Sequence, residues 1–264
     1  MYTFDYQRPA DRAAATADHQ GDTRYLAGGQ SLIQAMKLRL SSSERLVDLG
    51  GVGDLKGIRV EGDQVVVGAM TTHAAVAASA EVQRALPALA ELAGGIGDPA
   101  VRNMGTIGGS IANADPAACY PSAVLALGST VRTDRRSIAG DDFFTGLYET
   151  ALQPGELVVS VAFPIPEKAA YVKFKQPASR FALVGVFVAK TAGGVRVAVT
   201  GAKGSVFRAT AIEQALAGSF TAAAAKAVKL PSDDINADLH GSAEYRAAMI
   251  SVMAGRAVEA ALKR

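Results

Sequence analysis

The chain has 264 residues, 27.1 kDa, of which 49% are hydrophobic and 20% charged, with a formal net charge of +2. This length can bury a sizeable core in one large or two smaller domains, and the composition excludes a disordered, collagenous or coiled-coil chain. The near balance of 27 basic and 25 acidic residues gives no electrostatic footprint for nucleic acid or an anionic membrane. With no signal-peptide pattern at its start and no long apolar run, we expect a cytoplasmic protein without an integral membrane segment.

Cysteine and histidine are scarce in this sequence. Cys119 is its only cysteine, which excludes an intrachain disulfide and an iron–sulfur cluster held by this chain alone. Its three histidines, His19, His73 and His240, are far apart in the sequence. We therefore expect no metal site in this chain.

The first predicted elements form a strand–helix–strand unit. Alternation over residues 22–27 predicts a strand that runs into the Gly-Gly pair at 28–29. Ser31 and Gln34 have the spacing of a capping box, which predicts a helix over 32–40. A second apolar run over 45–49 predicts another strand, and the length of the connection favours parallel pairing of the two strands.

The middle of the chain changes pattern. Residues 58–61 and 64–68 flank Gly62-Asp63, which predicts a hairpin. An Ala- and Leu-rich run over 72–92 predicts a helix that is broken near Pro87. The elements expected next are a short helix over 122–127, a hairpin over 130–138 and a strand over 156–163.

The last third of the chain is predicted to begin after a linker at 164–168, where two prolines interrupt the periodic pattern. Thr210 with Glu213 is predicted to cap the first of several Ala-rich helices. The other elements expected here are three antiparallel strands over 171–176, 182–190 and 194–200, and a last helix over 242–262.

Two glycine-rich segments are candidate binding segments. Residues 27–32 read Ala-Gly-Gly-Gln-Ser-Leu between a predicted strand and helix, an arrangement that suits a phosphate and is also typical of an ordinary turn. Residues 106–116 combine small residues with Thr, Ser, Asn and Asp, which suits wrapping around an anion or polyol and is also typical of a long irregular loop. Both segments are expected to donate backbone hydrogen bonds, which is consistent with one diphosphate held from two sides. This pattern does not identify the cofactor.

Another glycine-rich stretch, Gly51 to Gly57, nearly matches the dinucleotide-binding fingerprint. Its third glycine is one place late, and a predicted strand follows where the fingerprint needs a helix. We interpret it as a plain loop, and the sequence contains no P-loop motif.

Several of these segments together resemble a known family. They are Ala-Gly-Gly-Gln-Ser-Leu-Ile at 27–33, Met-Lys-Leu-Arg at 36–39, Arg-Asn-Met-Gly-Thr-Ile-Gly-Gly-Ser-Ile-Ala-Asn-Ala-Asp-Pro-Ala-Ala at 102–118, and Tyr-Val-Lys-Phe-Lys-Gln-Pro-Ala-Ser-Arg-Phe-Ala at 171–182. The chain resembles the FAD-binding medium subunit of the molybdenum hydroxylases, the family of xanthine dehydrogenase and aerobic carbon monoxide dehydrogenase. The resemblance spans nearly the whole chain in the family's order.

The resemblance implies an α+β fold. Residues 1–166 would form an FAD-binding domain of the vanillyl-alcohol oxidase type, with subdomains over about 1–55 and 56–166. Residues 167–264 would form a C-terminal domain with a three-stranded antiparallel sheet and a helical bundle.

The resemblance also implies cofactor-binding residues and no catalytic side chain. The diphosphate and ribityl chain of noncovalent FAD would be held by Ala27, Gly28, Gly29, Gln30, Ser31 and Leu32, and by Thr106, Gly108, Gly109, Ser110, Asn113 and Asp115. Ile96 and Val158 would contact its rings. Lys175, in preference to Lys173, would reach the polar edge of the flavin, and Phe181 would lie near the isoalloxazine, where the carbon monoxide enzymes have a tyrosine. Cys119 stands where many relatives carry an aspartate, which puts that cofactor contact in doubt.

The implied function is electron transfer within a larger enzyme. A large subunit would carry molybdopterin, and a small subunit would carry [2Fe–2S] clusters. This chain would carry FAD, which would pass electrons to NAD⁺, oxygen or a quinone. The three subunits would assemble as a dimer of heterotrimers. Two alternatives stay open: a free-standing FAD-dependent oxidase or dehydrogenase of the same superfamily, and a non-catalytic nucleotide-binding module. This sequence identifies neither the substrate of the complex nor its terminal electron acceptor.

Overall fold

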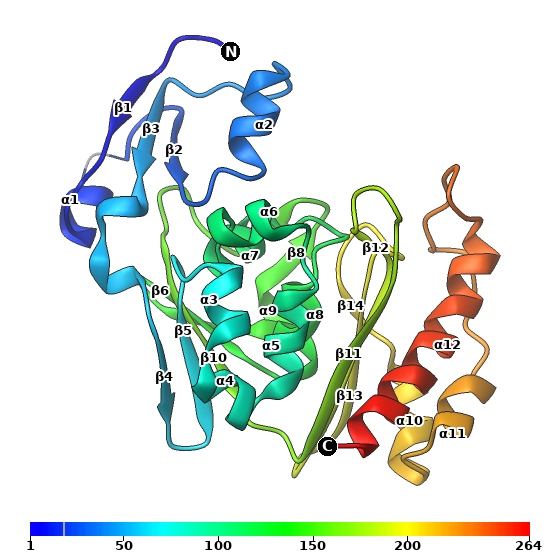
Figure 1. Cartoon of the computed structure of the whole chain (residues 1–264). Coiled ribbons are helices and arrows are strands. Elements are labelled where there is room, and N and C mark those ends of the chain that lie inside the picture. The colour runs from blue at the N-terminus through cyan, green and yellow to red at the C-terminus, as the bar shows by residue number, and fades with distance from the viewer. Residues whose placement is uncertain (18) are drawn as a thin grey trace.

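The computed structural model describes residues 1–17 and 19–264, and in this part of the chain the strands form four sheets (Figure 1). The sheets have the strand orders β1-β3-β2, β4-β5-β10-β6-β7, β11-β12-β13-β14 and β8-β9. Figure 1 shows the five-stranded sheet, a layer of helices, the four-stranded sheet and a final group of helices following one another across the molecule.

The N-terminal sheet confirms the predicted parallel pair. β2 (Thr23–Leu26) and β3 (Arg45–Asp48) pair in parallel, and the helix α2 (Leu32–Lys37) lies in the connection between them. A strand that the sequence analysis did not predict, β1 (Asp5–Gln7), pairs in parallel with the other side of β3. The short helix α1 (Arg12–Thr16) follows β1.

The middle sheet has β10 (Val158–Pro164) between two hairpins, with antiparallel partners on both sides. The predicted hairpins are confirmed as β4 (Ile58–Glu61) with β5 (Gln64–Gly68), and β6 (Thr130–Thr133) with β7 (Ser137–Ala139). The remaining elements of this part are η1 (Leu49–Gly51), η2 (Gly53–Leu55), α3 (His73–Ala78), α4 (Ala80–Ala85), α5 (Pro87–Gly94), α6 (Pro99–Met104), α7 (Ile107–Asn113), α8 (Tyr120–Ala126), α9 (Gly140–Phe143), β8 (Phe144–Gly146) and β9 (Glu149–Thr150).

The C-terminal sheet is covered on both faces. On β12 (Ala182–Thr191), Phe187 and Ala189 join the core of the helical layer, whereas Val186 and Val188 pack with the C-terminal helices. Burial on both sides explains why this strand is an almost continuous apolar run. The other elements are β11 (Lys168–Lys175), β13 (Gly194–Thr200), β14 (Phe207–Arg208), α10 (Thr210–Gly218), α11 (Ala222–Ala227) and α12 (Ala243–Leu262).

Several details differ from the predictions. The C-terminal sheet has a fourth, two-residue strand, β14, paired antiparallel with β13. The Ala-rich run breaks at Pro87 as predicted, and also at Ser79, whose side chain caps α4. Ser31 makes no side-chain cap for α2, and Ala209, not Thr210, is the N-cap of α10. Glu213 instead accepts hydrogen bonds from the Val197 amide and the Arg208 guanidinium, so its carboxylate is not available for a capping box.

Candidate flavin site

A cavity of about 460 Å³ lies where the N-terminal sheet, the helical layer and the tip of the β11–β12 hairpin meet. This volume is within the usual range for cofactor pockets. Of the sixteen residues expected to contact the cofactor, fifteen line this cavity, and Lys175 does not. The lining therefore brings together residues far apart in the sequence, from the segments at 27–32, 96–97, 105–119, 156–158 and 179–181.

Segment 27–32 supplies free backbone donors. Gly29 has a φ of +70°, which turns the chain between β2 and α2. Among the described residues, no protein acceptor pairs with the N–H groups of Gly29, Gln30 and Ser31. Adjacent amide donors before a helix are well suited to a phosphate. This part of the sequence prediction therefore has a physical basis in the structure.

Gly28 lines the cavity and is also required for packing. A Cβ atom at this position would lie 2.0 Å from the Met104 carbonyl oxygen and 2.7 Å from the Gly105 Cα. Because both are backbone atoms, only glycine allows segment 27–32 to pack against the end of α6. Gly28 thus joins the two binding segments to each other.

The second segment is a helix start and not a loop with free amides. Thr106 caps α7 and accepts a hydrogen bond from the Gly109 amide at 3.2 Å. The amides of Ile107, Gly108 and Ser110 donate to the carbonyls of Thr71, Ala69 and Thr106. The amides of residues 107–110 are therefore used by the protein itself, so the expected backbone hydrogen bonds to a ligand do not come from this part of the segment.

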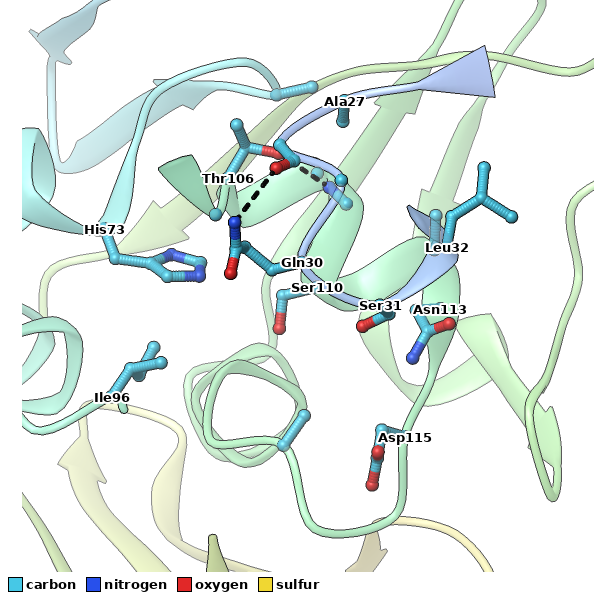
Figure 2. Close-up of a pocket in the computed structure, with 18 of the residues that line it drawn as sticks. Ala27, Gln30, Ser31, Leu32, His73, Ile96, Thr106, Ser110, Asn113 and Asp115 are labelled. Atoms are coloured by element: carbon cyan, nitrogen blue, oxygen red, sulfur yellow. Dashed lines mark hydrogen bonds between the residues drawn. The ribbon is translucent and has the colours of Figure 1, made fainter. Parts of the chain in front are cut away.

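Side chains from both segments offer further hydrogen-bonding groups. Figure 2 shows Gln30, Ser31, Ser110 and Asn113 turned toward the same open region. Their hydroxyl and amide groups can each donate and accept, which suits phosphate oxygens and the hydroxyls of a polyol. Asp115 is partly engaged, since its Oδ1 accepts from the Ala117 amide at 2.8 Å.

The lysine at the cavity is Lys173, so the preference for Lys175 is corrected. A register shift between Phe174 and Lys175 interrupts the pairing of β11 with β12, and Lys175 is exposed outside the cavity lining. Lys173 Nζ donates to the carbonyls of Gly95 and Arg180, both at 2.8 Å, and lies 3.5 Å from the Cys119 Sγ. Lys173 therefore connects the helical layer with the hairpin tip at the cavity wall.

The hairpin tip carries an aromatic side chain at this wall. Phe181 lines the cavity and keeps 50% of its surface exposed. Arg180 before it adopts a φ of +63° and donates to the Gly97 carbonyl at 3.2 Å. A left-handed conformation is uncommon for arginine, and these contacts hold it there.

His73 is a cavity residue that sequence reasoning missed. It is 5% exposed, its ring centroid lies 5.3 Å from that of Tyr120, and its Nδ1 is buried without a partner in the described structure. Burial, assisted by the nearby charge of Arg102, lowers the pKa of His73 to about 4, so the imidazole is neutral at pH 7. A lone histidine in an Ala-rich helix carries no sequence signal for such a position.

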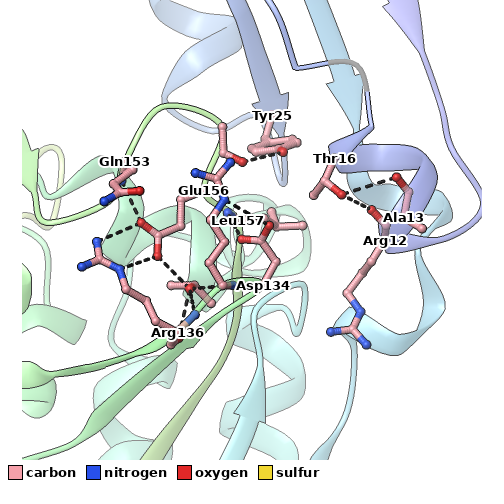
Figure 3. Close-up of polar contacts among 12 residues, drawn as sticks. Arg12, Ala13, Thr16, Tyr25, Asp134, Arg136, Gln153, Glu156 and Leu157 are labelled. Carbon is pink, nitrogen blue, oxygen red and sulfur yellow. Dashed lines mark hydrogen bonds and ion pairs between the residues drawn. The ribbon is translucent and has the colours of Figure 1, made fainter.

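A polar network surrounds Glu156, one of the residues that line the cavity (Figure 3). Glu156 accepts hydrogen bonds from Arg136 Nε at 2.9 Å, Thr133 Oγ1 at 2.8 Å and the Gln153 amide at 2.8 Å. The Arg136 hydrogen bond is the main reason why the pKa of Glu156 falls to about 2. The network holds the turn that leads to the cavity residues at 157 and 158.

The same turn is tied to the N-terminal sheet. The Tyr25 hydroxyl donates to the Gly155 carbonyl at 3.0 Å, and the Leu157 amide donates to Asp134 Oδ1 at 2.7 Å. Burial raises the pKa of Tyr25 to about 12, so the hydroxyl keeps its proton. The cavity is therefore bounded by segments from two sheets that are hydrogen-bonded to each other.

These residues fit a dinucleotide with one polar and two apolar parts. The free amides at 29–31 with the hydroxyls of Ser31 and Ser110 suit a diphosphate, whereas Ile96, Leu157 and Val158 offer apolar contacts for ring systems. In the described part of the chain, no group of three or more His, Cys, Asp or Glu residues is arranged to hold a metal ion. Among the described residues, none of the helices is long and apolar enough to cross a membrane.

Comparison with known proteins gives the class. The family described as "FAD binding domain in molybdopterin dehydrogenase" matches residues 2–166. The carbon monoxide dehydrogenase medium chain of Afipia carboxidovorans is 38% identical over 99% of this chain and 98% of its own length. The nicotine 6-hydroxylase medium subunit of Paenarthrobacter nicotinovorans is 36% identical over 90% of this chain and 89% of its own.

Solved structures agree with the sequence comparison. Reconstituted carbon monoxide dehydrogenase from Oligotropha carboxidovorans superposes with a TM-score of 0.89 at 37% identity, covering 100% of this chain and 99% of that one. Quinoline 2-oxidoreductase from Pseudomonas putida 86 superposes with a TM-score of 0.88 at 29% identity, covering 99% of this chain and 98% of that one. The chain belongs to the FAD-binding medium subunits of the molybdenum hydroxylases, the family of carbon monoxide dehydrogenase and xanthine dehydrogenase.

Proposed function

We propose that this chain is the electron-transfer subunit of a heteromeric molybdenum hydroxylase. When bound, FAD supplies the redox chemistry, taking electrons from [2Fe–2S] clusters of a small subunit and passing a pair to NAD⁺, oxygen or a quinone. A large subunit with molybdopterin would oxidise the substrate. The observation that carries this proposal is the cavity itself, which combines free amides, hydroxyls and apolar walls in a chain of this family.

The residues of this chain would bind and orient the cofactor. The amides of Gly29, Gln30 and Ser31 would hold the diphosphate, with Ser110 and Asn113 on the opposite side. The other proposed contacts are Ala27, Gly28, Leu32, Thr106, Gly108, Gly109 and Asp115 along the two segments, Ile96 and Val158 at the rings, and Phe181 and Lys173 near the flavin. Lys173 replaces Lys175 as the proposed cation at the flavin's polar edge, since a positive charge there favours added electrons.

We propose the same division of the chain as the resemblance implies, with residues 1–166 binding FAD noncovalently and 167–264 forming the second domain. The family match ending at residue 166 supports this boundary. The medium-chain names of the relatives support a complex with a large and a small subunit, for which we propose a dimer of heterotrimers in the cytoplasm.

The test is a comparison of the isolated subunit with the reassembled complex. The purified chain should carry FAD that heat or acid releases, and dithionite should bleach its visible absorbance. Heterocycles, aldehydes and carbon monoxide should have no effect until the cluster-bearing and molybdenum subunits are added. If this chain alone oxidised an organic substrate at an enzymatic rate, the proposal would be replaced by that of a free-standing oxidase. If the purified protein were colourless, the remaining candidate would be a non-catalytic nucleotide-binding module.

A further inference from the structure

The cavity wall at residues 95–97 is held from behind by an arginine. Arg102, in α6, donates from the same terminal nitrogen to the carbonyls of Ile96 at 2.9 Å and Gly97 at 3.0 Å. Ile96 and Gly97 line the cavity, whereas Arg102 does not. Among the ion pairs of the described residues none includes Arg102, so its guanidinium is directed at this loop and not at a carboxylate.

This contact fixes the direction of one peptide group. The described peptide bonds include no cis bond, and in a trans peptide the N–H points opposite to the C=O. Because the Ile96 carbonyl points to Arg102, the Gly97 N–H points away from Arg102, and Gly97 lines the cavity whereas Arg102 does not. In the described structure no protein acceptor pairs with this N–H, whereas the preceding amide, that of Ile96, donates to the Ala93 carbonyl at 3.2 Å.

Neither of the two other cations at this loop has a hydrogen bond to the Ile96 carbonyl among the described contacts, although Arg180 shares the Gly97 carbonyl with Arg102. Lys173 holds the Gly95 carbonyl, and Arg180 approaches only the Gly97 carbonyl, from an exposed position. In the described structure, Arg102 is the cation that holds the Ile96 carbonyl and thereby the peptide that carries the Gly97 N–H. Gly97 has a φ of +46°, and its Cβ would lie 2.9 Å from Val101, so the loop cannot easily take another residue or turn here.

We propose that Arg102 is a positioning residue that presents the Gly97 N–H to an acceptor atom of the bound isoalloxazine. The proposal rests on the proposed contact between Ile96 and the flavin rings. Reduction adds electron density to the ring acceptors, and hydrogen bonds to charged acceptors are stronger than those to neutral ones. An oriented N–H therefore binds reduced FAD more tightly than oxidised FAD, which raises the reduction potential.

The experiment uses the full chain loaded with FAD and three variants. Arg102→Met removes the donors, Arg102→Lys keeps the charge with a different geometry, and Arg84→Met is a matched control at an exposed arginine of α4. Four quantities are measured for each protein. They are the FAD affinity by reconstitution, the two-electron reduction potential, and the ¹⁵N shift and the hydrogen-exchange rate of the Gly97 amide, the last two with and without FAD.

We expect Arg102→Met to retain FAD, because the amides at 29–31 are untouched, and to lower the preference for reduced FAD about tenfold. Tenfold corresponds to a potential about 30 mV lower for a two-electron couple. FAD should slow exchange of the Gly97 amide in the wild type and the Arg84→Met control, and not in Arg102→Met. For Arg102→Lys, both the reduction potential and the slowing of Gly97 amide exchange by FAD should lie between the values of the wild type and of Arg102→Met.

The proposal is overturned if the Gly97 amide does not respond to FAD in the wild type, or if all four proteins share one potential while FAD stays bound. It is also overturned if Arg102→Lys has the wild-type reduction potential while FAD has the same effect on the Gly97 amide in every protein. The positive charge at residue 102, and not the orientation of the Gly97 N–H, would then set the potential. If Arg102→Met does not fold by circular dichroism, the Arg102→Lys values decide by the same criteria. A wild-type chain that binds no FAD contradicts the proposed function instead.

Discussion

Glu156 is a charged residue whose side chain is fully shielded from solvent, and its partners explain how that charge is tolerated. Arg136 makes two hydrogen bonds to its carboxylate, Thr133 adds a third and the Gln153 amide a fourth. A buried carboxylate is costly unless its oxygens are paired in this way. The arrangement lets a charged group stiffen the turn before the cavity residues Leu157 and Val158.

We predict that Glu156→Gln lowers the free energy of unfolding at pH 7 by about 2 kcal/mol, a figure reduced from the full pKa difference because Arg136 is partly exposed. The folded-state pKa lies at about 2, below the ordinary value of 4.5. The stabilisation is therefore complete above about pH 4.5 and is lost as the pH falls toward 2. Urea unfolding of both proteins between pH 7 and pH 3 measures this. A difference that does not shrink on acidification contradicts the assignment.

At the scale of elements, α7 is a helix that local sequence patterns do not predict. Its Gly-Gly-Ser stretch has low helix propensity, so a loop was the reasonable expectation. The helix forms because Ile107 and Ile111, one turn apart, are both fully buried and because carbonyls of residues 69 and 71 receive its first amides. Those carbonyls are distant in the sequence, so tertiary contacts decide this element.

β11 gives the second such case. Strict alternation places Lys173 and Lys175 on the same face, and the sequence offers no means of separating them. The pairing with β12 shifts register between Phe174 and Lys175, and of the two lysines Lys173 lines the cavity and Lys175 does not. Bulges of this kind depend on the pairing partner, here β12, and not on the strand's own residues.

We predict that Lys173→Met weakens FAD binding at least tenfold, whereas Lys175→Met leaves it unchanged within twofold. Lys173 joins the Gly95 and Arg180 carbonyls, and losing it leaves two carbonyls at the cavity without their donor. Fluorescence titration of the FAD-free protein with FAD gives both affinities. Because the two lysines lie on one strand, the pair also controls for general effects on β11. Equal affinities for the two variants would contradict a special role of Lys173, and a weaker affinity for Lys175→Met than for Lys173→Met would restore the original preference for Lys175.

At the scale of the molecule, much of the plan follows from patterns in the sequence. The parallel unit, both hairpins, the three long C-terminal strands and the last helix are local patterns of apolar residues and turns, and they were predicted. The packing of segment 27–32 against α6 and the neutral His73 in the wall depend on how distant elements meet. Sequence reasoning therefore predicted which segments meet at the cavity better than it predicted the contacts that each residue makes there.

The whole-molecule prediction concerns the mouth of the cavity, where we expect the cluster-bearing partner to dock beside Arg180 and Phe181. Electron transfer slows steeply with distance, so a partner must approach the cofactor closely, and Phe181 is a half-exposed aromatic at that place. Aromatic side chains of this kind are enriched in protein interfaces. Phe181→Ala should change the free energy of unfolding by about 0.5 kcal/mol or less, as is usual for exposed positions.

The same variant should slow substrate-dependent bleaching in the reassembled complex at least tenfold while dithionite bleaching of the isolated chain stays unchanged. Leu262→Ala is the matched control, since Leu262 is 51% exposed at the C-terminal end of α12, far from the hairpin tip (Figure 1). Stopped-flow absorbance with substrate, and separately with dithionite, gives both rates for each protein. If Phe181→Ala and Leu262→Ala bleach at the wild-type rate with substrate, the partner docks elsewhere on the molecule; if only the dithionite rate of Phe181→Ala changes, this side chain shields the cofactor and does not contact the partner.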